Sequence, residues 1–135
     1  MEAMETLELR RTLRGGKILY DSGVVSVENV QSTGYTVEFT LPVYKVMLLR
    51  VIVIKTDGTL DHYDVEIFDS SSPSADGINT VAQWNDVTAV NNWRVDDVTP
   101  TPFVNVEEEN KLYLKVTPDT NNIDFDIRIL AEPRQ

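Results

Sequence analysis

Residues 45–68 read KVMLLRVIVIKTDGTLDHYDVEIF, and this stretch indicates the fold class more clearly than any other part of the chain. Residues 45–55 are nearly all apolar, as is typical of a central strand that is covered on both faces. Asp57 and Gly58 follow, and an Asp-Gly pair supplies the positive φ angles of a tight hairpin turn. Residues 62–68 then alternate apolar and polar side chains, which predicts a return strand with one buried face. The stretch therefore predicts a β-hairpin.

On both sides of this hairpin, further short segments carry strand signals. They are residues 17–20, 24–27, 35–41, 81–84, 93–95, 103–106, 112–116 and 123–129. Turn residues such as Asp21-Ser22-Gly23 separate them at intervals of roughly 8–12 residues, a spacing typical of all-β sandwiches and barrels. One-sided strands favour the sandwich, because only one face of each sheet then needs to be covered. We expect an all-β, antiparallel β-sandwich, jelly-roll-like, with about 7–9 strands.

The first residues differ from the rest and are expected to form a short N-terminal arm. Residues 1–16 hold no strong core signal and end in Gly15-Gly16, a pair that breaks regular structure and makes a flexible hinge. We expect residues 17–135 to form a single β-sandwich domain. Two alternatives for the arm stay open: a frayed terminus, or an edge strand folded back onto its own sandwich.

The arm is also the segment that we expect to bind a partner. Its leucines would supply apolar contacts, and its arginines would pair with an acidic surface of a neighbouring copy or of another protein. The residues concerned are Leu7, Leu9, Arg10, Arg11, Leu13 and Arg14. An extra segment of this kind can lock copies together by adding a strand to the sheet edge of a neighbour.

The chain is strongly acidic outside this arm. Its 22 acidic and 12 basic residues give a net charge of −10, and residues 18–135 alone carry −11. An acidic body repels nucleic-acid backbones and anionic membranes, so we expect neither nucleic acid nor membrane as a partner. No apolar stretch approaches the roughly 20 residues of a membrane helix. The polar start of the chain does not resemble a secretory signal.

No residue pattern indicates catalysis or a bound cofactor. His62 is the single histidine and cysteine is absent, which leaves no histidine or cysteine cluster for a transition metal. The serines of residues 70–74 lack a nucleophile-elbow pattern, and no glycine-rich phosphate loop occurs. Residues 57–64 and 119–124 are rich in oxygen ligands that would suit calcium, but Asp and Asn are also ordinary turn residues. We expect a protein that is not an enzyme and holds neither metal nor cofactor.

Trp84 and Trp93 define the alternative function. Two exposed indole rings can form a platform on which sugar rings stack, as in carbohydrate-binding sandwiches, and nearby Asn and Asp side chains would hydrogen-bond the sugar hydroxyl groups. Core packing is the competing interpretation, because tryptophan is highly buried on average. The alternative is thus a carbohydrate-binding jelly-roll module with Trp84 and Trp93 as its stacking residues.

The segment from Tyr63 to Glu132 resembles a known group of proteins. Its order is YDVEIF (63–68), a serine-rich loop, DGI (76–78), KLYLKV (111–116) and DFDIRI (124–129). This order of strands and turns resembles the small β-sandwich proteins encoded among the virion genes of tailed bacteriophages. The resemblance implies a non-enzymatic structural protein located in the virion, as a capsid decoration, collar or neck, or tail or fibre component. The partners that it implies are other virion proteins and copies of the chain itself.

Overall fold

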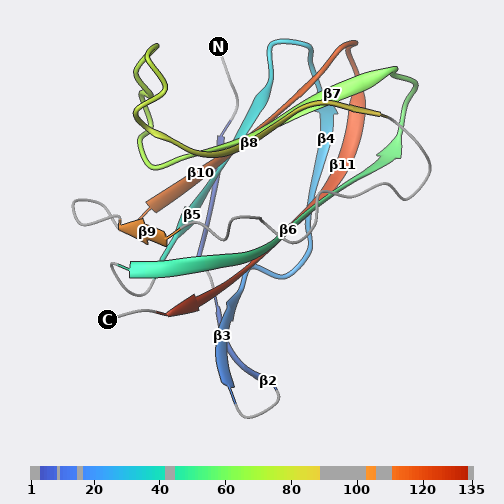
Figure 1. Ribbon diagram of the computed structural model, residues 1–135. Coiled ribbons are helices and arrows are strands. Elements are labelled where there is room, and N and C mark those ends of the chain that lie inside the picture. The colour runs from blue at the N-terminus through green and yellow to red at the C-terminus, as the bar shows by residue number, and fades with distance from the viewer. Residues whose placement is uncertain are drawn as a thin grey trace.

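The computed structural model describes residues 4–8, 10–14, 17–41, 45–88, 103–105 and 111–133. Within these ranges the chain is all β, without a helix (Figure 1). The strands are β1 (Met4–Glu8), β2 (Arg10–Arg14), β3 (Lys17–Asp21), β4 (Val25–Val30), β5 (Tyr35–Thr40), β6 (Lys45–Asp57), β7 (His62–Phe68), β8 (Thr80–Thr88), β9 (Phe103–Asn105), β10 (Lys111–Pro118) and β11 (Ile123–Pro133). The predicted antiparallel β-sandwich is confirmed, while the jelly-roll topology stays a prediction. More strands form than expected, partly because the first residues contribute β1 and β2.

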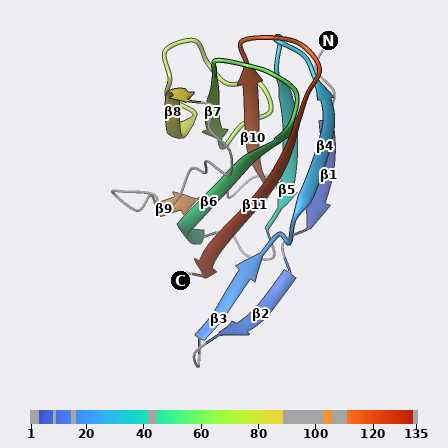
Figure 2. The ribbon, with the colours of Figure 1, turned by 90° about the vertical axis from the view of Figure 1, so that its right-hand side faces the viewer.

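Two sheets make up the sandwich (Figure 2). The five-stranded sheet has the order β1-β5-β10-β7-β8. The six-stranded sheet has the order β2-β3-β11-β6-β9, and β4 also pairs with β11. Neighbouring strands are antiparallel, with the exception of β1 and β5, which run parallel.

The hairpin predicted over residues 45–68 is wrong in its pairing, although both of its strands form. β6 lies in the six-stranded sheet and β7 lies in the five-stranded sheet. Gly58 adopts a φ of 95°, as the Asp-Gly pair predicts, but the connection carries the chain from one sheet to the other. Leu60 in this connection is buried, so the connection closes one end of the core. Sheets packed about 10 Å apart are within reach of so short a segment.

Two further connections cross between the sheets at the same end. Residues 31–34 join β4 to β5, and residues 119–122 join β10 to β11. We call residues 31–34, 58–61 and 119–122 the crossover end. In both ribbon views these connections lie on the upper side of the molecule, opposite the hairpin of β2 and β3 (Figure 1, Figure 2).

The turn predicted at Asp21-Ser22-Gly23 does not reverse the chain. β3 and β4 both pair antiparallel with β11, one after the other along the same strand. Ser22 bridges the gap between them, because its N–H donates to the carbonyl O of Ile129 at 3.1 Å and its Oγ accepts from the N–H of Ile129 at 2.9 Å. The end of β3 and the whole of β4 therefore lie one after the other beside β11.

The core lies between the sheets and uses the alternating positions of the strands. Its fully buried members include Val37, Phe39, Val53, Val65, Leu114, Val116, Phe125 and Ile127. Full burial of a large apolar side chain contributes roughly 1.5–3 kcal/mol to stability. Tyr63 of the five-stranded sheet and Phe125 of the six-stranded sheet meet edge to face, with ring centroids 5.1 Å apart. This contact joins the two sheets near the crossover end.

Tyr63 makes the stability of the chain sensitive to alkaline pH. Its buried hydroxyl group donates to the carbonyl O of Val53 at 3.1 Å, and burial raises its pKa above the ordinary value. The unfolded chain loses this proton near pH ~10 while the folded chain keeps it, so the free energy of unfolding falls as pH rises above about 10. We expect Tyr63→Phe to cost about 1 kcal/mol at neutral pH, through the lost hydrogen bond, and to reduce the alkaline loss. Urea denaturation at neutral and alkaline pH measures both effects, and an unchanged alkaline loss would contradict the assignment to Tyr63.

Candidate functional site

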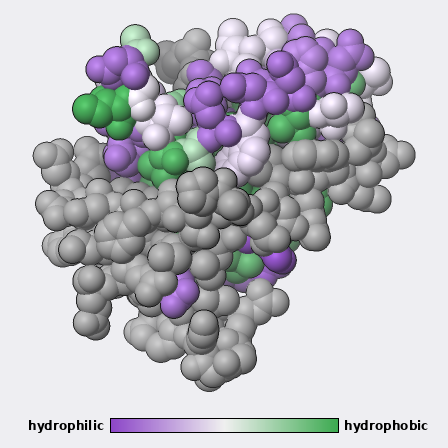
Figure 3. All heavy atoms as spheres, in the orientation of Figure 1, coloured by the Kyte–Doolittle hydropathy of each residue, from purple (hydrophilic) through white to green (hydrophobic). Residues whose placement is uncertain are grey.

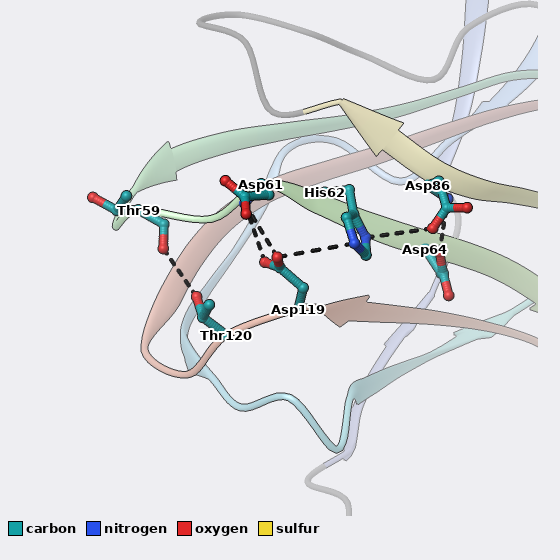
Figure 4. Close-up of polar contacts among 7 residues, drawn as sticks. All are labelled: Thr59, Asp61, His62, Asp64, Asp86, Asp119 and Thr120. Atoms are coloured by element: carbon teal, nitrogen blue, oxygen red, sulfur yellow. Dashed lines mark hydrogen bonds and ion pairs between the residues drawn. The ribbon is translucent and has the colours of Figure 1, made fainter.

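The candidate site is a group of polar side chains around His62, beside the crossover end (Figure 4). His62 is the first residue of β7, and its side chain is 48% exposed. Its Nδ1 atom lies 3.4 Å from Oδ1 of Asp86 on β8. Its Nε2 atom lies 4.0 Å from Oδ2 of Asp119, which begins the connection between β10 and β11. The imidazole ring therefore stands between two carboxylates from distant parts of the sequence.

Backbone N–H groups hold the carboxylates around this ring. The N–H of Asp61 donates to both carboxylate oxygens of Asp119, at 3.2 and 3.3 Å. The N–H of Asp86 donates to Oδ1 of Asp64 at 2.8 Å. Asp86 has a φ of 54°, in the left-handed region, which aspartate adopts more readily than most residues other than glycine. Sequence reasoning missed this group, because no local pattern brings residues 62, 86 and 119 together.

His62, Asp64 and Asp86 each offer one ligand atom to a cation, and these atoms lie within 4.8 Å of one another. Tetrahedral zinc, with ligands at about 2.0–2.2 Å, needs its ligand atoms roughly 3.3–3.5 Å apart. The distance between Nδ1 of His62 and Oδ1 of Asp86 fits this requirement. Asp64, however, already accepts the hydrogen bond from the N–H of Asp86, and none of the three side chains is buried. The group is at most a weak cation site, and the absence of a bound metal stays a prediction.

A chelator is accordingly expected to change the melting temperature by no more than about 2 °C, well under 1 kcal/mol in a domain of this size. The reason is that a cation bound to the folded state stabilises it by RT ln(1 + [L]/Kd), which is small for a weak site. Thermal unfolding in EDTA, and then in excess zinc or calcium, measures the shift. His62→Ala is the matched control. A larger drop, reversed by added cation in the wild type but not in the control, would contradict the prediction.

The oxygen-rich segment of residues 119–124 ties the connections of the crossover end together. Oδ1 of Asn121 accepts a hydrogen bond from the N–H of Ser32 at 2.9 Å. Oδ1 of Asp124 accepts one from the N–H of Asn29, also at 2.9 Å. These side chains thus satisfy backbone groups of the neighbouring strand and connection. Their ordinary structural use explains why the segment is rich in Asp and Asn.

A separate pocket of about 170 Å³ lies beside the serine-rich loop, against β5, β7 and β10. It is lined by Thr36, Glu66, Phe68, Ser70, Ser71, Pro73, Tyr113 and Lys115. Typical small-molecule sites are larger, at roughly 300–1,000 Å³. Phe68 and Tyr113 are buried, so their rings offer little surface to a ligand. This pocket therefore gives weaker grounds for a function than the residues around His62.

Only one of the two tryptophans considered for sugar stacking lies within the described residues. Trp84 is on β8, is partly buried and packs against the hydrophobic core. Its register partner on β7, Val65, is fully buried. An indole ring in this environment has less free face than a stacking platform needs. Trp93 lies outside the described residues, and sugar binding stays a prediction.

Five of the six predicted partner-binding residues lie in described strands, one in the five-stranded sheet and four in the six-stranded sheet. Leu7 is in β1, opposite Phe39 of β5. The residues of β2 are registered against β3, with Arg10 opposite Asp21, Arg11 opposite Tyr20, Leu13 opposite Ile18 and Arg14 opposite Lys17. Leu9 lies outside the described residues. This placement corresponds to the alternative in which the first residues pair with their own sandwich, and binding of a partner by them stays a prediction.

Comparison with known proteins assigns no family to the chain. No protein-family model matches it, and no curated protein sequence matches it significantly. Among the residues that the structure describes, no helix has the length and apolar character needed to cross a membrane.

Proposed function

We propose that the chain is a non-enzymatic structural protein of a bacteriophage virion, a capsid decoration, collar or neck, or tail or fibre component, that acts through protein–protein assembly. The observation that carries the proposal is the arrangement of its first strands. β1 forms the outer edge of the five-stranded sheet, parallel to β5, while β2 belongs to the six-stranded sheet. Only residue 9 separates the two strands.

An N-terminal strand at a sheet edge suits exchange between copies. β1 is held by the backbone of β5, so the same strand from a neighbouring copy would find the same pairing positions. Exchange of an identical element is a low-cost route to assembly, because it reuses contacts that already exist within one copy. The resemblance of residues 63–132 to small virion sandwich proteins supports the same proposal.

Size-exclusion chromatography with light scattering tests this function. The isolated chain is measured first, and then mixed with purified particles of the phage that encodes it or with their major shell protein. We expect self-association, binding to a particle component, or both. A strict monomer that binds no particle component would overturn the proposal.

Deleting residues 1–14 tests the part played by the first strands. We expect the truncated chain to lose oligomerisation or particle binding, because β1 and β2 are gone. We also expect its melting temperature to fall by several degrees, since β5 then becomes an unprotected edge. Light scattering, particle binding and thermal unfolding measure these changes. If the truncated chain assembles like the wild type, β1 and β2 play no part in assembly.

The rival proposal, a carbohydrate-binding module, has its own test. Glycan-array binding by the wild type that disappears in Trp84→Ala or Trp93→Ala, with folding retained, would favour the rival. The packing of Trp84 against the core gives that outcome less support.

A further inference from the structure

The hairpin of β2 and β3 extends away from the sandwich on the side opposite the crossover end (Figure 1, Figure 2). β3 is registered with β11 only at Asp21 and Tyr20, whereas β2 and β3 pair along their whole length. At the base of the hairpin, Nε of Arg128 on β11 donates to Oδ1 of Asp21 at 2.9 Å. Beyond this anchor the hairpin is a two-stranded ribbon, a structure that is only marginally stable by itself.

The hairpin also concentrates positive charge. Residues 10–21 contain four basic side chains, Arg10, Arg11, Arg14 and Lys17, and one acidic side chain, Asp21, which is held by Arg128. The net charge of −10 therefore divides into +3 on these twelve residues and −13 on the rest of the chain. No twelve-residue stretch outside the hairpin carries so many positive charges.

The crossover end and its flanking residues carry the opposite charge. Residues 26–34, 57–64 and 117–124 contain six carboxylates: Glu28, Asp57, Asp61, Asp64, Asp119 and Asp124. Two lysines reach this end from the adjoining strands, because Nζ of Lys55 donates to the carbonyl O of Gly58 at 2.6 Å and the side chain of Lys115 lies against Gly34. Six carboxylates against two lysines leave an excess of four negative charges. In the space-filling view, the coloured hydrophilic side chains gather along this upper rim (Figure 3). Glu28, Asp57 and Asp61 are exposed. Their side chains are therefore available to a positively charged partner.

One copy cannot neutralise its own acidic end with its own hairpin. Asp124 is paired with Asp57 at the start of β11, and Leu130 is paired with Asp21 six residues further on. At roughly 3.3 Å per residue these pairs are about 20 Å apart, and the four residues from Asp21 to Lys17 add about 13 Å more. Both distances exceed the Debye length of about 8 Å at physiological salt, so attraction within one copy is screened.

We propose that copies of this chain associate head to tail, with the β2–β3 hairpin of one copy docked on the crossover end of the next. The inference rests on the proposed assembly function and adds to it a second contact between copies, distinct from the exchange of β1. A second copy is a suitable partner, because the carboxylates of its crossover end can pair with the four basic residues of the hairpin. The −13 charge on the rest of the chain repels an anionic partner such as nucleic acid. Because the two contact surfaces differ, the contact repeats from copy to copy and builds a ring or a filament.

A charge-swap experiment tests the proposal, with self-association measured by sedimentation equilibrium. The hairpin variant carries Arg10→Glu, Arg11→Glu and Arg14→Glu, and the crossover variant carries Glu28→Lys, Asp57→Lys and Asp61→Lys. We expect each variant alone to self-associate at least roughly tenfold more weakly than the wild type, and a mixture of the two to regain association. The variant Arg10→Lys, Arg11→Lys, Arg14→Lys keeps the charge and should behave like the wild type. Circular dichroism confirms that each variant is folded before it is measured.

The possible outcomes separate this contact from the proposed function. Weakened variants whose mixture recovers, together with weaker wild-type association at high salt, would support head-to-tail docking. Variants that self-associate as well as the wild type, or a mixture that does not recover, would overturn it. A wild-type chain that binds phage particles but never itself would also overturn this contact and leave the assembly function standing. Failure to bind either particles or itself would overturn both.

Discussion

Phe125→Ala is expected to lower the free energy of unfolding by about 3–5 kcal/mol, because it removes a large ring from a closely packed interior. Phe125 is fully buried on β11, and its ring meets that of Tyr63 from the opposite sheet. The change therefore leaves a cavity where the two sheets are in contact. In a domain of this size the loss corresponds to a fall in melting temperature of roughly 10–20 °C.

Urea and thermal unfolding of the variant measure this loss. Val24→Ala is the matched control, because Val24 is 64% exposed and its truncation should cost less than about 0.5 kcal/mol. Phe125→Leu, which keeps most of the volume, should lie between the two. A loss below about 1 kcal/mol for Phe125→Ala would contradict the packing of the two sheets around this ring.

Gly58→Ala is expected to cost about 2–4 kcal/mol, for two separate reasons. Gly58 has a φ of 95°, a conformation that side chains with a Cβ atom rarely adopt. A Cβ atom at this position would also lie 2.8 Å from the carbonyl O of Asn122 and 2.7 Å from Cδ1 of Ile123. Because one of these atoms belongs to the backbone, relief requires the connection between β10 and β11 to move.

Gly23→Ala is the control that separates the cost of the positive φ from the cost of the close contact with the Cβ atom. Gly23 also has a positive φ, of 68°, but no atom lies within 4 Å of the position that its Cβ would take. We expect this control to cost about 1 kcal/mol, from the backbone conformation alone. Unfolding in urea compares the two variants. Equal losses would show that Gly58 does not pack closely against the neighbouring connection.

The strands could be predicted from the sequence because their signal is local. Alternation in residues 35–41 and 123–129 predicts one face toward the core, and the structure places Val37 and Phe39 of the first segment and Phe125 and Ile127 of the second there. In β5 the polar residues Thr36 and Glu38 of the other face are buried as well, which the alternation does not predict. A period of two arises whenever one side of a strand faces a core, whatever its neighbours are. Strand existence therefore follows from the residues themselves.

Strand pairing could not be predicted in the same way. Asp57-Gly58 permits a tight change of direction, but a turn within one sheet and a crossing between two sheets both need it. Leu60 in the crossing is buried over the end of the core, whereas Val24 and Ile78 in other connections are exposed, so an apolar residue in a connection does not by itself distinguish a crossing from a turn.

The polar group around His62 illustrates a harder limit. Its carboxylates come from Asp86, 24 residues later, and Asp119, 57 residues later in the chain. They meet because β7 is paired with β8 on one side and with β10 on the other. Without knowledge of that order, nothing in the spacing of the three residues indicates that they are neighbours.

The position of β11 has a consequence for how a newly made chain reaches its fold. β11 is the last described strand, yet β3, β4 and β6 all depend on it for hydrogen bonds. During synthesis, the edges of these three strands that pair with β11 therefore have no hydrogen-bonding partner until about residue 130 has left the ribosome. At about 5–20 residues per second, their apolar faces stay exposed for several seconds. We therefore expect the nascent chain to be most exposed to aggregation before its final strand arrives, and a ribosome stalled before residue 123 would leave it unable to close the six-stranded sheet.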